Sequence, residues 1–92
     1  MHNELRDLLQ YMLSHHIIGA RHAPEDRLIT SRIKHLPRNV QKEFYEEYDA
    51  LCRKGWCIRL KKRTGKGSDW HISINPEYTS EIMGYVGEDN EI

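Results

Sequence analysis

The chain has 92 residues, of which 38% are hydrophobic and 30% are charged, with 14 basic and 14 acidic side chains. This length predicts one domain with a single modest core. The chain shows no apolar run long enough to span a bilayer and no secretory leader, so we expect a cytoplasmic protein with no membrane partner. Two cysteines are too few for a disulfide framework, and we expect both thiols to be reduced.

The charges are distributed unevenly along the chain. Residues 76–92 contain five acidic and no basic side chains, so residues 1–75 carry a clear basic excess. From Arg53 to Lys66 there are seven basic residues and no acidic one. A local positive field attracts a polyanion whatever the total charge of the protein, so this stretch favours such a partner.

A first amphipathic helix is predicted from Asn3, which can act as its N-cap, to residues 15–16. Its apolar side chains recur at helical spacing and are Leu5, Leu8, Leu9, Met12 and Leu13. Ile17 and Ile18 then form a very short extended segment, which can matter to the fold only if it pairs with another strand.

A second helix is predicted to open at Pro24, which is tolerated at a helix start. It should end by Leu36, because the residue before Pro37 is disfavoured in helical conformation. Two acidic residues in its first turn suit the helix dipole. Its apolar positions are Leu28, Ile29, Ile33 and Leu36.

The longest helix is predicted over residues 38–54. Asn39 can act as its N-cap, and Gly55 can adopt the left-handed conformation that commonly ends a helix. Steps of four, four and three between apolar residues place them on one side of a 3.6-residue period. These residues are Val40, Phe44, Tyr48 and Leu51.

Alternating residues predict a two-stranded ribbon directly after this helix, with a turn that contains Gly65 and Gly67. The apolar rows are Trp56, Ile58 and Leu60 in the first strand and Trp70, Ile72 and Ile74 in the second. We expect both rows to meet one core, and both tryptophans to serve packing rather than base stacking. The first strand's other side carries Cys57, Arg59 and Lys61.

A fourth helix is predicted to start at Asn75 and Pro76 and to end at Gly87. One side of it is apolar, with Tyr78, Ile82, Tyr85 and Val86. We therefore expect residues 1–76 to form the main domain and residues 77–87 to pack on it or to form a dimer interface. The acidic residues 88–92 are expected to be disordered.

In element order and hydrophobic spacing, residues 4–76 resemble the winged helix-turn-helix family, and more loosely its small uncharacterised prokaryotic and archaeal members. The resemblance is carried by LPRNVQKEFYEEYDALCRKGW, a helix that runs into a strand, and by CIRLKKRTGKGSDWHISINP, a hairpin. It implies an α+β winged helix-turn-helix fold with a three-helix core, a C-terminal β-hairpin wing and a short fourth helix. It also implies double-stranded DNA binding, as in a transcriptional regulator.

The resemblance further implies that the recognition helix, about residues 38–54, enters the major groove while the basic wing, residues 61–67, lies on the DNA backbone. Side chains of the types that reach base edges near the helix start are Arg38, Asn39, Gln41 and Lys42. Side chains expected to contact phosphates are Lys34, His35, Lys61, Lys62, Arg63 and Lys66.

Acidic side chains on the same helix oppose this interpretation, because carboxylates repel phosphates. They are Glu43, Glu46, Glu47 and Asp49. Either only the first turn of the helix approaches DNA, or the wing alone touches nucleic acid and the helix is solvated or binds protein. A protein–protein interaction module that uses this acidic outward face is therefore the alternative, with RNA binding third. A homodimer through the first or the fourth helix is a separate hypothesis.

No enzyme chemistry, cofactor or metal site is predicted. The TGKGS stretch is too short for a phosphate-binding loop and precedes no helix. The acidic residues of the long helix face outward, whereas a paired-carboxylate site needs a cleft. Cys52 and Cys57 have no second pair of ligands at zinc spacing, and partly buried thiols beside Trp56 are the simpler interpretation.

Overall fold

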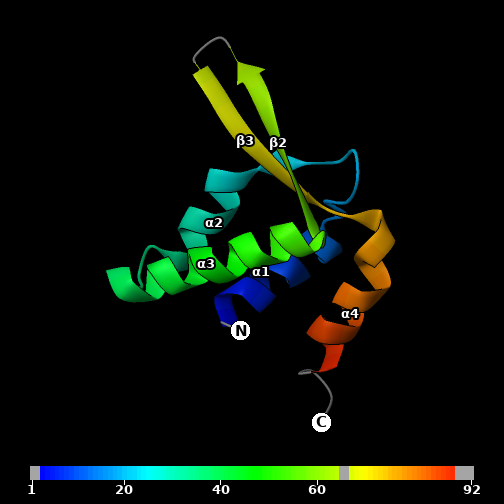
Figure 1. The fold of residues 1–92 in the computed structure, drawn as a ribbon, viewed down its shortest axis with the longest axis horizontal. Helices are drawn as coiled ribbons and strands as arrows, with labels where there is room; N and C mark the ends of the chain where they lie inside the picture. Colours follow the sequence, from blue (N-terminus) through cyan, green and yellow to red (C-terminus); the bar gives the residue numbers. More distant parts are fainter. Residues whose placement is uncertain (1–2, 65–66, 89–92) are drawn as a thin grey trace.

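The computed structural model describes residues 3–64 and 67–88, with the side chains of these residues except 63, 64, 67–69 and 88. The elements are α1 (Asn3–Ser14), β1 (Ala23–Pro24), α2 (Glu25–Ile33), α3 (Arg38–Lys54), β2 (Cys57–Thr64), β3 (Gly67–Ile74), the 3-10 turn η1 (Pro76–Tyr78) and α4 (Thr79–Glu88) (Figure 1). The helices and the antiparallel sheet make an α+β fold, with the elements in the predicted order. Lys66 and residues 89–92 of the acidic tail lie outside the described residues. Glu88, which was expected to be disordered with that tail, is instead the last residue of α4.

α3 occupies the residues predicted for it, but it starts in a different way. Pro37, not Asn39, takes the N-cap position, with φ −60° and ψ 155°. The N–H groups of Val40 and Gln41 donate to the Pro37 carbonyl at 3.0 and 2.9 Å. Gly55 ends the helix with φ 99°, in the left-handed region that glycine adopts at little steric cost.

The short extended segment lies later in the chain than predicted. Ile18 forms an isolated parallel bridge with Ile74, and the strand itself is Ala23–Pro24. Gly19 has φ 62° and donates its N–H to the Ile74 carbonyl at 2.9 Å. The chain therefore turns away from β3 after one bridge and returns to it at β1, which pairs antiparallel with β3.

The described strands form one antiparallel sheet in the order β1-β3-β2, so β3 is central and β2 is an edge. In Figure 1 the β2–β3 hairpin rises from the C-terminal end of α3 and extends beyond the helices. Residues at the base of the hairpin can therefore join the core, whereas its outer part projects from the body.

The register of the hairpin corrects the predicted faces of β2. Cys57 pairs with Ile74 and is buried, so the odd-numbered residues of β2 share the core-side face with the even-numbered residues of β3. Ile58 and Leu60 lie on the opposite face and are 42% and 46% exposed. The expectation that their row meets the core is wrong, because the strand pairing places the intervening residues on the core side.

The two tryptophans have different environments. Trp56 precedes β2, is buried, and donates its Nε1–H to a Glu81 carboxylate oxygen at 3.0 Å. Trp70 lies on the core-side face but is 41% exposed, because it is farther out along the hairpin than the fully buried Ile72. The predicted packing role is confirmed for Trp56, whereas Trp70 is only partly covered.

α1 lies at the centre of the hydrophobic core and packs against α2, α3, α4 and β3. Four of its side chains are fully buried, namely Leu5, Leu8, Leu9 and Met12. Ile82 and Val86 of α4 belong to the same core, so both apolar stripes suggested for a homodimer are covered within the chain. The dimer hypothesis is left with exposed side chains such as Met83. Among the described helices, none is both long and apolar enough to cross a membrane.

Candidate nucleic-acid interface

Four of the predicted contact residues meet at the turn between α2 and α3. The turn is tight because Leu36 donates its N–H to the Ile33 carbonyl at 2.9 Å and Pro37 then starts α3. The exposed side chains on and beside this turn are Lys34, His35, Arg38 and Asn39. The turn can therefore present positive charge and amide groups to a ligand.

Gln41 differs from these four residues, because its side chain is half-buried. Its Nε2–H donates to the Leu36 carbonyl at 2.9 Å and so holds the α2–α3 turn against α3. Base readout by Gln41 would require this hydrogen bond to break. The sequence offered no sign of the bond, since it joins residues across a turn whose geometry is set by Pro37.

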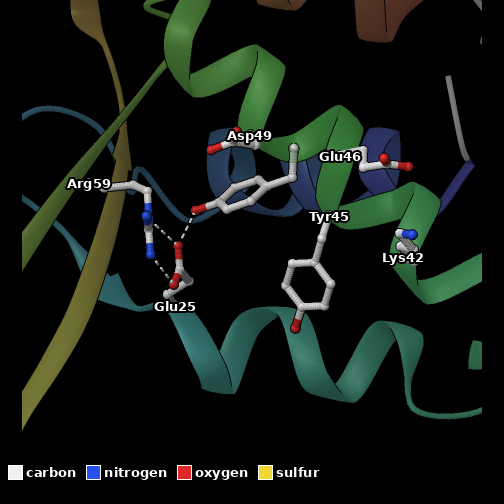
Figure 2. A pocket seen from close by; sticks show the side chains of 7 residues that line it. Glu25, Lys42, Tyr45, Glu46, Asp49 and Arg59 are labelled. Atoms are coloured by element: carbon white, nitrogen blue, oxygen red, sulfur yellow. Dashed lines mark hydrogen bonds and ion pairs between the residues drawn. The ribbon is translucent and has the colours of Figure 1, made fainter.

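Lys42 lies one turn after Arg38 in α3, and its neighbours include acidic side chains. It lines a cavity of about 350 Å³ between α2, α3 and β2 (Figure 2). The other residues that line this cavity are Glu25, Tyr45, Glu46, Tyr48, Asp49 and Arg59. We refer to it as the acidic groove. Its carboxylates on α3, Glu46 and Asp49, are two of the four that were expected to repel phosphates.

An ion pair between the buried Glu25 and the exposed Arg59 forms the floor of the acidic groove. Glu25 is 9% exposed and accepts two hydrogen bonds from Arg59, from Nε at 2.7 Å and from Nη2 at 2.9 Å. The Tyr48 hydroxyl donates to the same carboxylate at 2.5 Å. Burial and this hydrogen bond raise the pKa of Tyr48 far above its usual value of 10.0. Glu25 therefore ties the start of α2 to β2 through Arg59 and to α3 through Tyr48.

Arg59 also extends the network toward the outer part of the hairpin. Its guanidinium carbon lies 4.3 Å from the centroid of the Trp70 ring, a cation–π contact. Lys61, which pairs with Trp70 in the sheet, has its Nζ 5.8 Å from the same centroid. The groove-side face of the hairpin thus combines two cations with an exposed aromatic ring.

The remaining predicted phosphate contacts are on the hairpin. Lys61 and Lys62 are both exposed, and their places in the register put them on opposite faces of β2. The side chain of Arg63 and the whole of Lys66 lie outside the described residues.

The predicted cations do not form one continuous patch in the described structure. One group lies at the α2–α3 turn, and the other lies on the hairpin, which rises from the opposite end of α3 (Figure 1). α3 has 17 residues, which makes it about 25 Å long at the usual rise per residue. The acidic groove lies between the two groups, so a polyanion would have to meet them separately.

The neighbouring Cys52 thiol and burial raise the pKa of the Cys57 thiol above its usual 9.0. Cys52 is half-buried at the end of α3, and Cys57 is buried at the start of β2. Within the part of the chain that the structure describes, no three His, Cys, Asp or Glu side chains gather as metal ligands would.

The arrangement therefore offers two places for an anionic ligand and one acidic, aromatic groove between them. Sequence reasoning identified the cations but missed Glu25, Tyr48, Arg59 and Trp70 as a connected set. Comparison with family models, curated proteins and solved structures found no match for this chain.

Proposed function

We propose that this protein binds double-stranded DNA in the manner of a winged-helix transcriptional regulator, with the β2–β3 hairpin as its principal contact. The expected order of helices and strands supports the proposal, as does the pairing of the short strand β1 with the hairpin. The residues on which that resemblance was based lie in α3 and in the hairpin that follows it.

The observation that carries the proposal is the charge of the projecting hairpin. β2 runs from the core outward as CIRLKKRT, with four basic residues and no acidic one. Arg59, Lys61 and Lys62 of this strand are exposed, and the outer part of the hairpin extends past the helices in Figure 1. Phosphate contacts of this kind supply affinity and position the protein but do not specify sequence.

The part of α3 that reads bases would be restricted to its first turn. Arg38 and Asn39 are exposed there, and their side chains are of types that match guanine and adenine. Farther along the helix, Glu46 and Asp49 line the acidic groove and would face phosphates at an energetic cost. We therefore expect strong dependence on salt and modest discrimination between sequences.

The test is a titration of a mixed-sequence duplex with the protein at several salt concentrations, followed by fluorescence anisotropy of labelled DNA. Each phosphate contact that a substitution removes should lower the slope of log K against log salt by about 0.9. The double substitution Lys61→Ala with Lys62→Ala should therefore flatten the slope by nearly 2. Arg21→Ala, which removes an exposed cation from the loop before β1, is the matched control.

The outcome is read from the slope rather than from affinity alone. A flattened slope in the double variant and an unchanged slope in Arg21→Ala would support the hairpin as a phosphate contact. If the double variant kept the slope of the unaltered protein, the hairpin would be excluded from the interface. An absence of binding at low salt would reject the proposed function itself.

The acidic groove favours one second candidate, a protein–protein interaction module. Tyr45 is 45% exposed beside Glu46 and Asp49, and an exposed aromatic side chain among carboxylates suits a basic partner segment. Such a partner would shift the amide resonances of α3, whereas DNA should shift those of the hairpin and the α2–α3 turn.

A further inference from the structure

Trp70 is exposed in a way that its sequence pattern does not predict. The indole continues the row of Ile72 and Ile74, which are fully buried, yet it is itself 41% exposed. It lies on the groove-side face of the hairpin, farther from the base of the hairpin than Ile72. A large apolar ring left in water at this position is available to a ligand.

The Trp70 ring also packs against a network of hydrogen-bonded side chains. Arg59 lies against Trp70 at 4.3 Å from the ring centroid, and its guanidinium is fixed by two hydrogen bonds to Glu25. Glu25 is held in turn by the Tyr48 hydroxyl. The two hydrogen bonds to the buried Glu25 carboxylate fix the orientation of the guanidinium that contacts the exposed indole. The side chains therefore fix a binding surface before any ligand arrives.

The chemistry around the ring suits one class of ligand. Lys61 and Arg59 place two positive charges beside Trp70, and among the described side chains on this face of the hairpin there is no carboxylate other than the Glu25 that pairs with Arg59. An aromatic ring next to cations matches a nucleotide, which offers an apolar sugar or base face beside a phosphate. An apolar peptide would offer no anion to Lys61.

We propose that Trp70 is the residue through which the hairpin makes direct apolar contact with a polynucleotide, while Lys61 meets the neighbouring phosphate. Arg59 is a positioning residue, since it acts through the orientation of the indole. This inference rests on the proposed function and deepens it, because it assigns to Trp70 a contribution to DNA affinity that does not come from charge.

Intrinsic fluorescence gives the first test, because the chain has two tryptophans in different environments. Trp56 is 6% exposed and hydrogen-bonded to Glu81, so a change in emission when duplex DNA is added should come from Trp70. We expect DNA to quench the emission of the unaltered protein. The quench should be absent in Trp70→Phe, which keeps an aromatic ring at this position.

Affinity gives the second test, and the opposite face of the hairpin supplies its control. Trp70→Ala should weaken the binding of duplex DNA several-fold and should leave the salt slope unchanged because every phosphate contact remains. Trp70→Phe should recover part of this affinity. Leu60→Ala removes a side chain of similar exposure from the other face and should not alter affinity.

Arg59→Lys tests the positioning role, because lysine keeps the charge but cannot make the two-pronged bond to Glu25. It should reduce the quench by DNA while the salt slope stays unchanged. Circular dichroism of each variant before titration shows that the protein is folded. A full quench in Arg59→Lys would overturn the positioning role.

The two proposals fail in different ways. If labelled DNA binds but does not quench the protein, or if Trp70→Ala and Leu60→Ala have equal effects, the role of Trp70 is overturned and DNA binding stands. If labelled DNA does not bind, the proposed function is rejected and the role of Trp70 with it. Titrations with single-stranded DNA show which part of the nucleotide Trp70 contacts. If Trp70→Ala costs more affinity for the single strand than for the duplex, the contact is with an unpaired base. If the loss of affinity is equal for both, the contact is with the sugar.

Discussion

Tyr48 shows how one hydroxyl can fix the arrangement of three elements. It is 4% exposed on α3, and it donates to Glu25 at the start of α2, which also binds Arg59 of β2. Because the acceptor is a buried carboxylate, the hydrogen bond belongs to the stronger, charge-assisted class. Without it, one oxygen of Glu25 would be less well satisfied, although the ion pair with Arg59 would remain.

We predict that Tyr48→Phe lowers the free energy of unfolding by about 1.5–3 kcal/mol near neutral pH, as for a hydrogen bond to a charged group. Urea denaturation followed by circular dichroism measures the difference. Tyr45→Phe is the matched control, because Tyr45 lies three residues earlier and is 45% exposed. Its effect should fall within about 0.5 kcal/mol.

The cost of Tyr48→Phe should also depend on pH. Folding raises the pKa of Tyr48 above its usual 10.0, so the stability linked to this group is present below pH 10 and is lost as the pH rises further. Phenylalanine does not ionise, so the gap between the two proteins should narrow above pH 10. A gap that stayed constant up to pH 11 would contradict the pKa shift.

At the scale of elements, the end of α3 depends on the conformation of Gly55. Its φ of 99° is strained for any residue with a Cβ, and a Cβ at this position would lie 3.2 Å from the Cε2 atom of Tyr78. The same turn lets Gly55 and Trp56 donate to the carbonyls of Cys52 and Leu51. The direction in which β2 leaves the helix is set by this turn.

We predict that Gly55→Ala destabilises the protein by about 1–2 kcal/mol, through backbone strain and the contact with Tyr78. Gly84→Ala is a control of opposite sign, because Gly84 lies inside α4 with no atom within 4 Å of the position of a new Cβ. It should stabilise the protein by about 0.5–1 kcal/mol. Equal shifts of both variants in thermal or urea denaturation would refute the assignment.

The elements themselves were largely predictable, since helical periodicity and the positions of proline and glycine are local signals. α3 begins and ends at the predicted residues, and α1 ends at Ser14, close to the expected point. The faces of β2 were not predictable, because Cys57 and Ile58 are both apolar and only the pairing of Cys57 with Ile74 decides which one is buried. Strand register depends on distant residues that local alternation does not contain.

At the scale of the whole molecule, the two proposed functions predict opposite effects of the acidic groove. Glu46→Gln with Asp49→Asn removes two negative charges from the groove. If DNA approaches α3, this variant should bind duplex DNA several-fold more tightly at low salt, because charge repulsion is reduced. If the groove binds a basic protein segment, the same variant should lose that partner.

Glu77→Gln is the control for a general change in net charge, since Glu77 is exposed in η1, outside the acidic groove. A similar gain from Glu77→Gln would show that net charge, rather than the groove, governs DNA affinity. Anisotropy titrations of the three proteins under one buffer condition make the comparison.

The candidate site was less predictable than the fold, for a reason that concerns the whole chain. The basic residues in 34–42 and 61–66 could be identified from the sequence alone. Those whose side chains the structure describes are exposed, namely Lys34, His35, Arg38, Lys42, Lys61 and Lys62. The Glu25–Arg59 ion pair joins residues 34 positions apart, and Glu25 looked like an ordinary acidic residue in a first helical turn. Its partner became identifiable only once the sheet register was known.

The central position of α1 has a consequence for the order in which the protein can fold. Arg6 of α1 donates to the Tyr85 hydroxyl at 3.3 Å and lies over its ring, a contact between residues 79 positions apart. During synthesis α1 is made before α4, which covers part of it. Contacts of such long sequence separation form slowly. The nascent chain therefore keeps part of the apolar surface of α1 uncovered until α4 has emerged.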